Sequence, residues 1–175
     1  MAKWTIDPSH SEVGFKVKHL MITNVKGSFR DYNATITTEG EDFVNPNVEF
    51  TAKTASIDTA DDKRDAHLRS ADFFDSENYP ELKFISTGYE RIDTENFTLY
   101  GDLTIKNITK PVKLNVVFEG IMKDPYGQTK AGFTIEGKFN RKEWELNWNA
   151  ALEAGGVLVG DEIRVMCEVQ MTKEA

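Results

Sequence analysis

Apolar and polar residues alternate along most of the chain with a period of two, the spacing at which successive side chains of a β-strand point to opposite faces. The clearest run covers residues 12–20, where Val13, Phe15, Val17 and His19 share one face and lysines occupy the other. Seven further runs, each bounded by Gly, Asn, Asp or Pro, lie at 27–36, 47–57, 81–90, 97–105, 112–120, 130–139 and 161–171. The pattern therefore predicts about eight strands.

The second of these runs loses its alternation between Phe29 and Tyr32, which indicates a bulge or bend near Arg30 and Asp31. Long strands of closed sheets bend in this way. An open sheet of this size would expose long unpaired edges, so we expect the sheet to close. The predicted fold is all-β: one domain over residues 1–175, built as an extended eight-stranded antiparallel barrel with a short helical cap.

The helix is predicted at about residues 61–70, which depart from the strand pattern. Arg64, His67, Leu68 and Ala71 follow the i, i+3, i+4, i+7 spacing of one helical face. An arginine and a histidine therefore share a face with a leucine, in contrast to the apolar faces of the strands.

Polar residues mark the start of this helix. Asp61 and Asp62 occupy positions where acidic side chains favour a helix N-terminus, and Thr59 is a candidate cap. Asp65 and Arg69 are four residues apart, so we expect them to pair on the outer surface of the helix.

Two interpretations of the helical face stay open, because it is followed at once by Phe73 and Phe74. In the first, Leu68 and the two phenylalanines plug the barrel, and a neighbouring carboxylate pairs with Arg64. In the second, the same residues form the mouth of a cavity, where Arg64 and His67 offer hydrogen-bond donors to the head group of a ligand. Composition alone favours the plug.

Charge and cysteine content exclude some classes of function. The 29 acidic and 21 basic side chains give a formal charge of −8, which repels nucleic-acid phosphates and anionic lipid surfaces alike, so no nucleic-acid partner is expected. The single cysteine, Cys167, lies in an alternating run and is expected to be a small core residue. No apolar run approaches the roughly 20 residues of a transmembrane helix, and residues 1–10 lack the pattern of a secretory signal, so we expect a cytoplasmic protein.

A catalytic interpretation would use His67 as a base oriented by Asp65 or Asp61, or the neighbouring arginine as an anion clamp. Asp65 is only two residues from His67 and so projects from a different side of the helix, and the chain has no nucleophile motif or phosphate loop. No metal-ligand spacing relates the histidines, which are His10, His19 and His67. We therefore expect neither catalysis nor a metal or other cofactor.

Four segments follow one another in a recognisable order over nearly the whole chain. They are "WTIDPSHSEVGFKVKH" at 4–19, "KRDAHLRSADFFDSENYPELKF" at 63–84, "LYGDLTIKNITKPVKL" at 99–114 and "VGDEIRV" at 159–165. Together they resemble the YceI-like family, the lipocalin-like polyisoprenoid-binding proteins. The resemblance implies an eight-stranded barrel with a helical cap, whose apolar interior holds a long isoprenoid or similar amphiphilic chain.

The family motifs match individual positions of this chain: Trp4, Asp7, His10, Ser11, Phe15, His19, Arg64, Asp65, His67, Leu68, Phe73, Phe74, Tyr79, Pro80 and Phe84. We interpret Trp4, Asp7 and Pro80 as structural: an apolar anchor, a carboxylate that starts a turn, and a turn stop. Many family members carry a secretory signal that is not evident here, so a periplasmic carrier role is not implied.

With the resemblance, the helix is expected to be the lid of a lipid cavity. The expected ligand-binding residues are Val13, Phe15, Val17, His19, Leu20, Met21, Phe29, Arg64, His67, Leu68, Phe73, Phe74, Phe84, Leu103 and Ile105. The predicted function is non-catalytic carriage or sequestration of a polyisoprenoid or another long-chain amphiphilic lipid. The open alternative is an interaction or stress-response module with a filled barrel. Barrels of this family often associate, so a homodimer is a further expectation.

Overall fold

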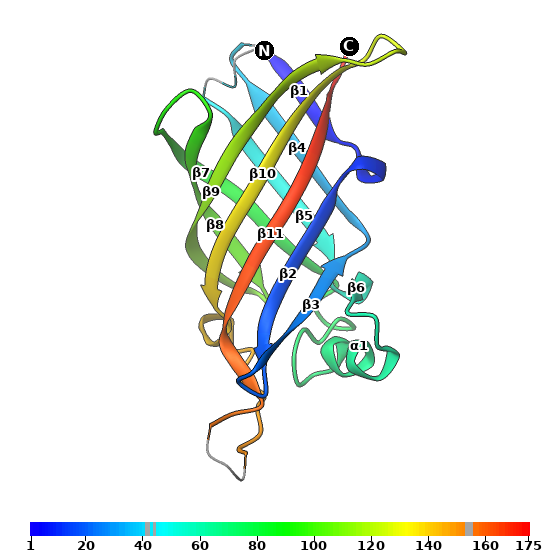
Figure 1. The fold of residues 1–175 in the computed structure, drawn as a ribbon, viewed down its shortest axis with the longest axis vertical. Coiled ribbons are helices and arrows are strands. Elements are labelled where there is room, and N and C mark those ends of the chain that lie inside the picture. The colour runs from blue at the N-terminus through cyan, green and yellow to red at the C-terminus, as the bar shows by residue number, and fades with distance from the viewer. Residues whose placement is uncertain (41–42, 44, 153–155) are drawn as a thin grey trace.

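The alternating segments pair into one antiparallel sheet of eleven strands in the computed structural model, which describes residues 1–40, 43, 45–152 and 156–175 (Figure 1). The strands are β1 (Ala2–Ile6), β2 (Glu12–His19), β3 (Thr23–Phe29), β4 (Tyr32–Thr38), β5 (Asn47–Lys53), β6 (Ile57–Asp58), β7 (Glu81–Arg91), β8 (Asn96–Ile105), β9 (Ile108–Lys123), β10 (Thr129–Asn140) and β11 (Val159–Lys173). The helices are α1 (Asp62–Arg69) and three short 3-10 turns, η1 (Pro8–His10), η2 (Thr54–Ser56) and η3 (Arg141–Trp144).

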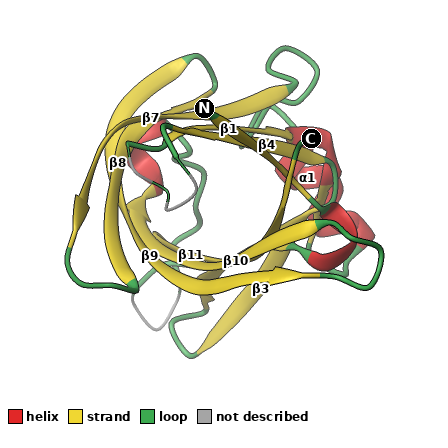
Figure 2. Ribbon diagram, turned by 90° about the horizontal axis from the view of Figure 1, so that it is seen from above, coloured by secondary structure: helices red, strands yellow, loops and turns green. Residues whose placement is uncertain are grey.

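The sheet closes because β1 pairs with β4 on one side and with β11 on the other. The resulting ring contains eight strands in the order β1-β4-β5-β7-β8-β9-β10-β11, and Figure 2 views it from above. The predicted eight-stranded antiparallel barrel is therefore confirmed. Strand β1, which completes the ring, was not among the predicted strands.

Three long strands are interrupted, and each carries two labels: β1 and β2, β3 and β4, and β5 and β6. The C-terminal part of β11 pairs with β1, and the rest of it pairs with β2. The predicted bend at Arg30 and Asp31 is confirmed: it separates β3, which pairs with β2 and β6, from β4, which pairs with β1 and β5. Strands β2, β3 and β6 continue the barrel beyond the ring, toward the end at which α1 lies. This end is called the lower end below (Figure 1).

Helix α1 lies at the lower end beside β6 (Figure 1). In the described part of the chain, β6 pairs with β3 alone, whereas β7 continues the ring between β5 and β8. The sheet is consequently interrupted between β6 and β7, and the helix with residues 70–80 is the segment that connects these two strands. The observed helix agrees with the predicted bounds of about 61–70.

Both chain termini lie at the upper end (Figure 1), and aromatic side chains near it pack against one another inside the barrel. The ring of Phe43 lies 4.9 Å from that of Trp4, 5.4 Å from that of Phe118 and 5.0 Å from that of Phe133, measured between centroids. Trp4 is only 1% exposed, in accordance with its interpretation as an apolar anchor. These rings fill the barrel at this end, so an internal cavity can open only elsewhere.

Asp7 starts the turn between β1 and β2, as its position before Pro8 indicated. Its carboxylate accepts hydrogen bonds from Ser9 Oγ (2.7 Å) and His10 Nδ1 (3.0 Å), and Lys130 Nζ lies 3.3 Å away. These donors, Ser9 first, hold the pKa of Asp7 well below its usual range. His10 is thereby held on the outside of the barrel.

Among the described residues, no helix is both long enough and apolar enough to span a bilayer.

Candidate functional site

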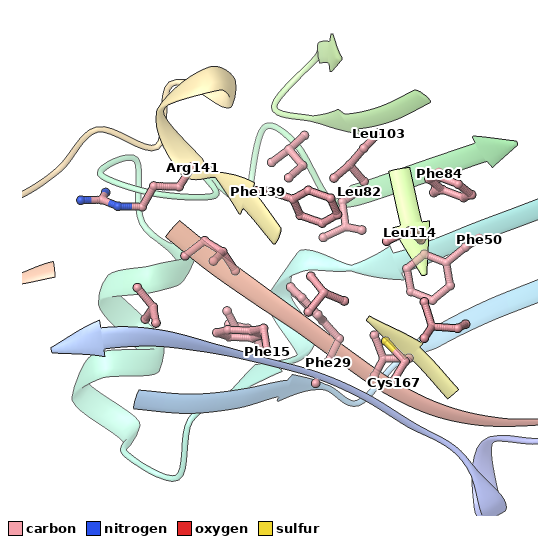
Figure 3. Close-up of a pocket in the computed structure, with 18 of the residues that line it drawn as sticks. Phe15, Phe29, Phe50, Leu82, Phe84, Leu103, Leu114, Phe139, Arg141 and Cys167 are labelled. Carbon is pink, nitrogen blue, oxygen red and sulfur yellow. The ribbon is translucent and has the colours of Figure 1, made fainter. Parts of the chain in front are cut away.

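The interior of the barrel contains a cavity of about 660 Å³. This volume lies within the range of small-molecule sites, which are roughly 300–1,000 Å³. Aliphatic and aromatic side chains supply nearly all of its wall. Figure 3 shows aromatic rings from different strands, among them Phe15, Phe29, Phe50 and Phe139, gathered around one space.

Period-two alternation explains why the wall is apolar. Along β2 the lining side chains include Val13, Phe15 and Val17, while Lys16 between them points outward. Every second residue of β11, from Ile163 through Cys167 to Met171, also lines the cavity. The apolar face of each strand was therefore predictable from its sequence, because adjacent residues of a strand face opposite sides.

The cavity has its polar rim at the lower end. Lys18 at the end of β2, together with Asp61 and Lys63 at the start of α1, both line the cavity and are exposed to solvent. Because aromatic rings fill the barrel near the upper end, these residues mark the mouth.

Helix α1 is held at the mouth by a hydrogen-bonded set around Thr59. Asp65 is buried, with 7% exposure, and accepts hydrogen bonds from the Thr59 amide (2.9 Å) and hydroxyl (2.6 Å). Arg64 donates from Nε to the same hydroxyl (2.7 Å) and from Nη2 to the Thr59 carbonyl (2.6 Å). Arg64 is thus oriented by a threonine and not by the carboxylate that the plug interpretation expected.

Two details of the predicted helix are wrong. Asp65 does not pair with Arg69 on the outer surface, because its carboxylate turns inward to Thr59. Thr59 is not the cap: the side chain of Asp61 accepts the hydrogen bond from the Arg64 amide (3.0 Å), as an N-cap residue does. The i, i+4 spacing permits a surface pair of Asp65 with Arg69. The amide and hydroxyl of Thr59, the residue after β6, instead donate hydrogen bonds to the Asp65 carboxylate.

An aromatic cluster stands beside the helix at the mouth. The ring of His67 lies edge-on to those of Phe73 and Trp148, with centroid distances of 5.1 and 4.5 Å. His67 Nε2 lies 2.8 Å from Asp72 Oδ2. Trp148 was not among the predicted site residues, because the segment after η3 has no strand or helix periodicity from which to infer its direction.

Arg141 is a second important residue that the sequence pattern did not single out. It is only 3% exposed, and it donates to the carbonyls of Gly160 (2.9 Å), Trp148 (2.9 Å) and Val159 (3.4 Å), and to that of Leu146. Burial lowers the pKa of its guanidinium. The four carbonyl groups and the nearby carboxylate of Asp161 hold the guanidinium in place. Its side chain (Figure 3) therefore joins Leu146 and Trp148 to Val159 and Gly160, and the first three of these residues line the cavity.

The sequence did contain a signal for Arg141. Ile135, Gly137, Phe139 and Arg141 have the same parity, and Ile135 and Phe139 line the cavity. A charged residue in phase with the inward-facing side chains of β10 indicates a buried arginine that needs several hydrogen-bond acceptors.

The sequence model of the YceI-like domain matches residues 4–171. The chain belongs to the YceI-like family. A UPF0312 protein of Staphylococcus aureus is 37% identical over 165 residues, and one of Staphylococcus epidermidis is 36% identical; the alignments cover 94% of each chain. The resemblance predicted from the four motifs is thus confirmed over almost the full length.

Solved structures share the YceI-like barrel. The Campylobacter jejuni YCEI protein superposes with a TM-score of 0.76 at 34% identity, over 97% of this chain and 96% of that one. Burkholderia cenocepacia BcnA gives a TM-score of 0.81 at 19% identity, over 94% and 98%. A polyisoprenoid binding domain from Saccharophagus degradans gives 0.65 at 11% identity, over 98% of each chain, a likeness that shows the fold alone.

All the predicted site residues of this YceI-like barrel except Leu20 and Met21 lie on the cavity wall. Leu20 and Met21 are 41% and 58% exposed and lie outside the wall. Strand β2 ends at His19, and both residues adopt positive φ values in the turn that follows, so the alternation that points Val17 and His19 inward no longer applies.

The cavity wall also includes many residues that were not predicted to contact ligand. Besides Arg141 and Trp148, they include Ile36, Val48, Phe50, Leu82, Leu99, Leu114, Val116, Phe133, Ile135, Phe139 and Val165. Their strands were predicted, but the choice of residues was confined to the family motifs and the lid.

The described residues contain no group of three or more His, Cys, Asp or Glu side chains that could hold a metal ion. The carboxylate beside His67 is Asp72, not Asp65 or Asp61, which the catalytic interpretation had considered. Asp72 is exposed, so this pair lies on the solvent side of the mouth.

Cys167 on the cavity wall is expected to resist thiol reagents. Burial raises the pKa of its thiol to about 11, so at pH 8 only about one molecule in a thousand carries the reactive thiolate. Labelling with 5,5′-dithiobis(2-nitrobenzoic acid) at pH 8 should be slow in the folded protein and fast in concentrated guanidinium. Rapid labelling without denaturant would contradict the buried placement.

Proposed function

We propose that residues 1–175 form one non-catalytic domain that binds a polyisoprenoid or another long-chain amphiphilic lipid for carriage or sequestration. The observation that carries the proposal is the apolar cavity of about 660 Å³ that runs inside the barrel and has its polar rim at one end. Such a site suits a ligand with a long hydrocarbon tail and a polar head. The description of the Saccharophagus degradans domain as polyisoprenoid binding supports the same class of ligand.

Burial of the tail can supply the affinity. At about 0.8 kcal/mol per methylene, a five-carbon isoprene unit contributes up to roughly 4 kcal/mol before the cost of ordering the chain. Micromolar binding requires only about 8 kcal/mol. A few units are therefore sufficient, and binding should depend more on the volume of the cavity than on the identity of the chain.

The polar head would lie among the side chains of the mouth. Lys63, Arg64 and His67 all line the cavity at its lower end. Arg64 uses Nε and one terminal nitrogen to bind Thr59, which leaves its other terminal nitrogen as a donor. In this proposal α1 is the lid, its apolar residues contact the tail, and Arg64 with His67 contacts the head.

Mass spectrometry of an organic extract tests the proposal directly. The natively folded protein, purified without detergent, and an unrelated protein from the same host are extracted in parallel. A stoichiometric isoprenoid or fatty chain in the first extract alone is the expected result. If no lipid is extracted and added fluorescent fatty-acid or isoprenoid probes do not bind either, the filled interaction module replaces the lipid binder.

Phe73→Asp is expected to reduce lipid uptake at least tenfold, because it places a charge in the apolar lid beside His67 and Trp148. Fluorescent-probe titration measures uptake, and circular dichroism verifies the fold. Ala71→Asp is the matched control, since Ala71 is exposed two residues away. Unchanged uptake by a folded Phe73→Asp protein would show that α1 and its following loop are not the lid.

We also propose that the protein is cytoplasmic and that it forms a homodimer. Cell fractionation tests the compartment, and sedimentation velocity tests the oligomeric state. A periplasmic or secreted protein, or a strict monomer at micromolar concentration, would overturn the corresponding part without affecting the lipid site.

A further inference from the structure

The lower end carries exposed apolar side chains next to the mouth of the cavity (Figure 1). Ile22 is 78% exposed, Met21 58%, Leu20 41% and Val157 40%. These four residues, called the apolar tip below, come from two loops that are joined by a hydrogen bond from the Leu20 amide to the Leu158 carbonyl (2.9 Å). Leu158 itself lines the cavity, so the tip is continuous with the mouth.

The backbone conformation of Leu20 and Met21 in the tip favours smaller or polar residues. Leu20 and Met21 have φ values of 52° and 63°, in the left-handed region that favours Asn and Gly in hairpin turns. The turn between β8 and β9 has the same φ values at Lys106 and Asn107, which are polar, as solvated turns usually are. Two large apolar side chains therefore occupy positions with positive φ that are 41% and 58% exposed, although the side chain of Met21 also packs over Gly156.

Basic side chains form a row on one side of the barrel above the tip. Register places Lys26 opposite Lys16, Lys16 opposite Arg164, and Arg164 opposite Lys138, across the neighbouring strands β3, β2, β11 and β10. All four point outward, because the residues next to them in each strand line the cavity. These four residues form what is called the basic belt below.

The belt is unfavourable for the isolated protein. Like charges directly opposite each other on paired strands repel. Arg164 is partly compensated by Glu162, whose carboxylate lies 3.2 Å from its Nε. Lys16, Lys26 and Lys138 make no ion pair with any residue that the structure describes. These three lysines thus carry positive charge that no described carboxylate balances.

The spacing between tip and belt matches a membrane surface. Lys16 and Lys26 lie three steps along the strands from the last pair of the hairpin, His19 and Thr23, which corresponds to about 10 Å. Apolar groups of peripheral proteins reach about 5–10 Å into the boundary between head groups and acyl chains. With the tip inserted to this depth, the belt lies at the level of the lipid phosphates.

We propose that the lower end of the barrel docks on an anionic lipid bilayer, with the apolar tip inserted and the basic belt against the phosphates. The mouth of the cavity then faces the membrane, so that a lipid can pass between bilayer and barrel without crossing water. The docking rests on the tip and the belt alone, whereas lipid transfer also rests on the proposed function.

The net charge of −8 repels an anionic bilayer, as the sequence indicated, but salt weakens this repulsion. At physiological ionic strength, electrostatic interactions between exposed charges are screened beyond about 8 Å. The charges nearest the membrane therefore determine the attraction. In the proposed orientation they include the belt and Lys18, together with the exposed carboxylates of Asp161, which pairs with Lys142, and of Glu162, which pairs with Arg164.

Vesicle flotation tests the tip. The full chain is mixed with vesicles of phosphatidylcholine and phosphatidylglycerol, and it is expected to float with them. Leu20→Asn/Met21→Gly/Ile22→Ser should weaken this binding more than tenfold while leaving the fold as stable or more stable, since Asn and Gly suit the turn. Met122→Ser/Tyr126→Ser is the matched control: both side chains are exposed, at 75% and 90%, at the upper end, and binding should not change.

Charge substitutions test the belt. Lys16→Gln/Lys26→Gln is expected to weaken binding to the anionic vesicles about 25-fold, or about fivefold per lysine, and to reduce its salt dependence. Lys3→Gln/Lys123→Gln removes the same charge at the upper end and should have little effect. Binding to vesicles of phosphatidylcholine alone should be weak for every protein.

Two results would overturn the docking: no binding of the unaltered chain to anionic vesicles, or equal binding by the tip variant and the unaltered chain. Binding by the belt variant with unchanged affinity and salt dependence would also overturn it. The lipid site is measured separately, with a fluorescent isoprenoid probe dispersed without vesicles. The tip variant should bind this probe normally, so a failure of docking is distinguishable from a failure of the proposed function.

Discussion

Val165→Trp is expected to weaken binding of a long-chain lipid at least a hundredfold. Val165 lies in the middle of β11, opposite Phe15 on one side and Gly137 on the other, and its side chain lines the cavity. The interior of an eight-stranded barrel is only wide enough for one small ligand, so an indole at mid-height divides it. Loss of a single buried isoprene unit costs up to roughly 4 kcal/mol, which corresponds to about a thousandfold in affinity.

Met166→Trp is the matched control for this substitution. Met166 is the next residue of β11, and it is 49% exposed on the outside of the barrel. It introduces the same indole without entering the cavity, so affinity should remain within about twofold. Titration with long and short fluorescent probes measures the difference. If Val165→Trp bound the long probe as tightly as Met166→Trp did, the ligand would not occupy the barrel.

Replacement of Arg141 by Met is expected to lower the free energy of unfolding by about 3–5 kcal/mol. The arginine is 3% exposed and binds four backbone carbonyls, among them those of Leu146 and Val159. Methionine fills similar space but leaves these acceptors without donors in a buried site. Urea unfolding measures the loss, and hydrogen exchange should show faster opening of residues 146–150 and 157–160 than of the other strands.

Arg141→Lys separates charge from hydrogen bonding. Lysine keeps the positive charge, but its single ammonium cannot reach the set of carbonyls that the planar guanidinium binds. It should therefore recover less than half of the lost free energy of unfolding. Stability equal to that of the unaltered protein would show that charge alone is needed, and that the hydrogen bonds of Arg141 do not hold the mouth.

The sequence by itself determined the strands, because alternation with period two is a local property of the chain. It indicated which side chains of β2 and β11 face inward, and the slip in parity located the bend at Arg30 and Asp31. The spacing of Arg64, His67 and Leu68 likewise located α1, since the period of a helix is also local. The family was evident from motifs distributed over nearly the whole chain.

The tertiary structure alone decided how these elements meet. The short strand β1 belongs to the ring only because β4 and β11 lie on its two sides, and Asp65 turns inward only because Thr59 packs beside it. The same holds for the four carbonyls around Arg141 and for the volume of the cavity, which depends on what every strand contributes. The row of opposed basic residues across β3, β2, β11 and β10 arises from strand register, which relates residues far apart in the sequence and leaves no local pattern.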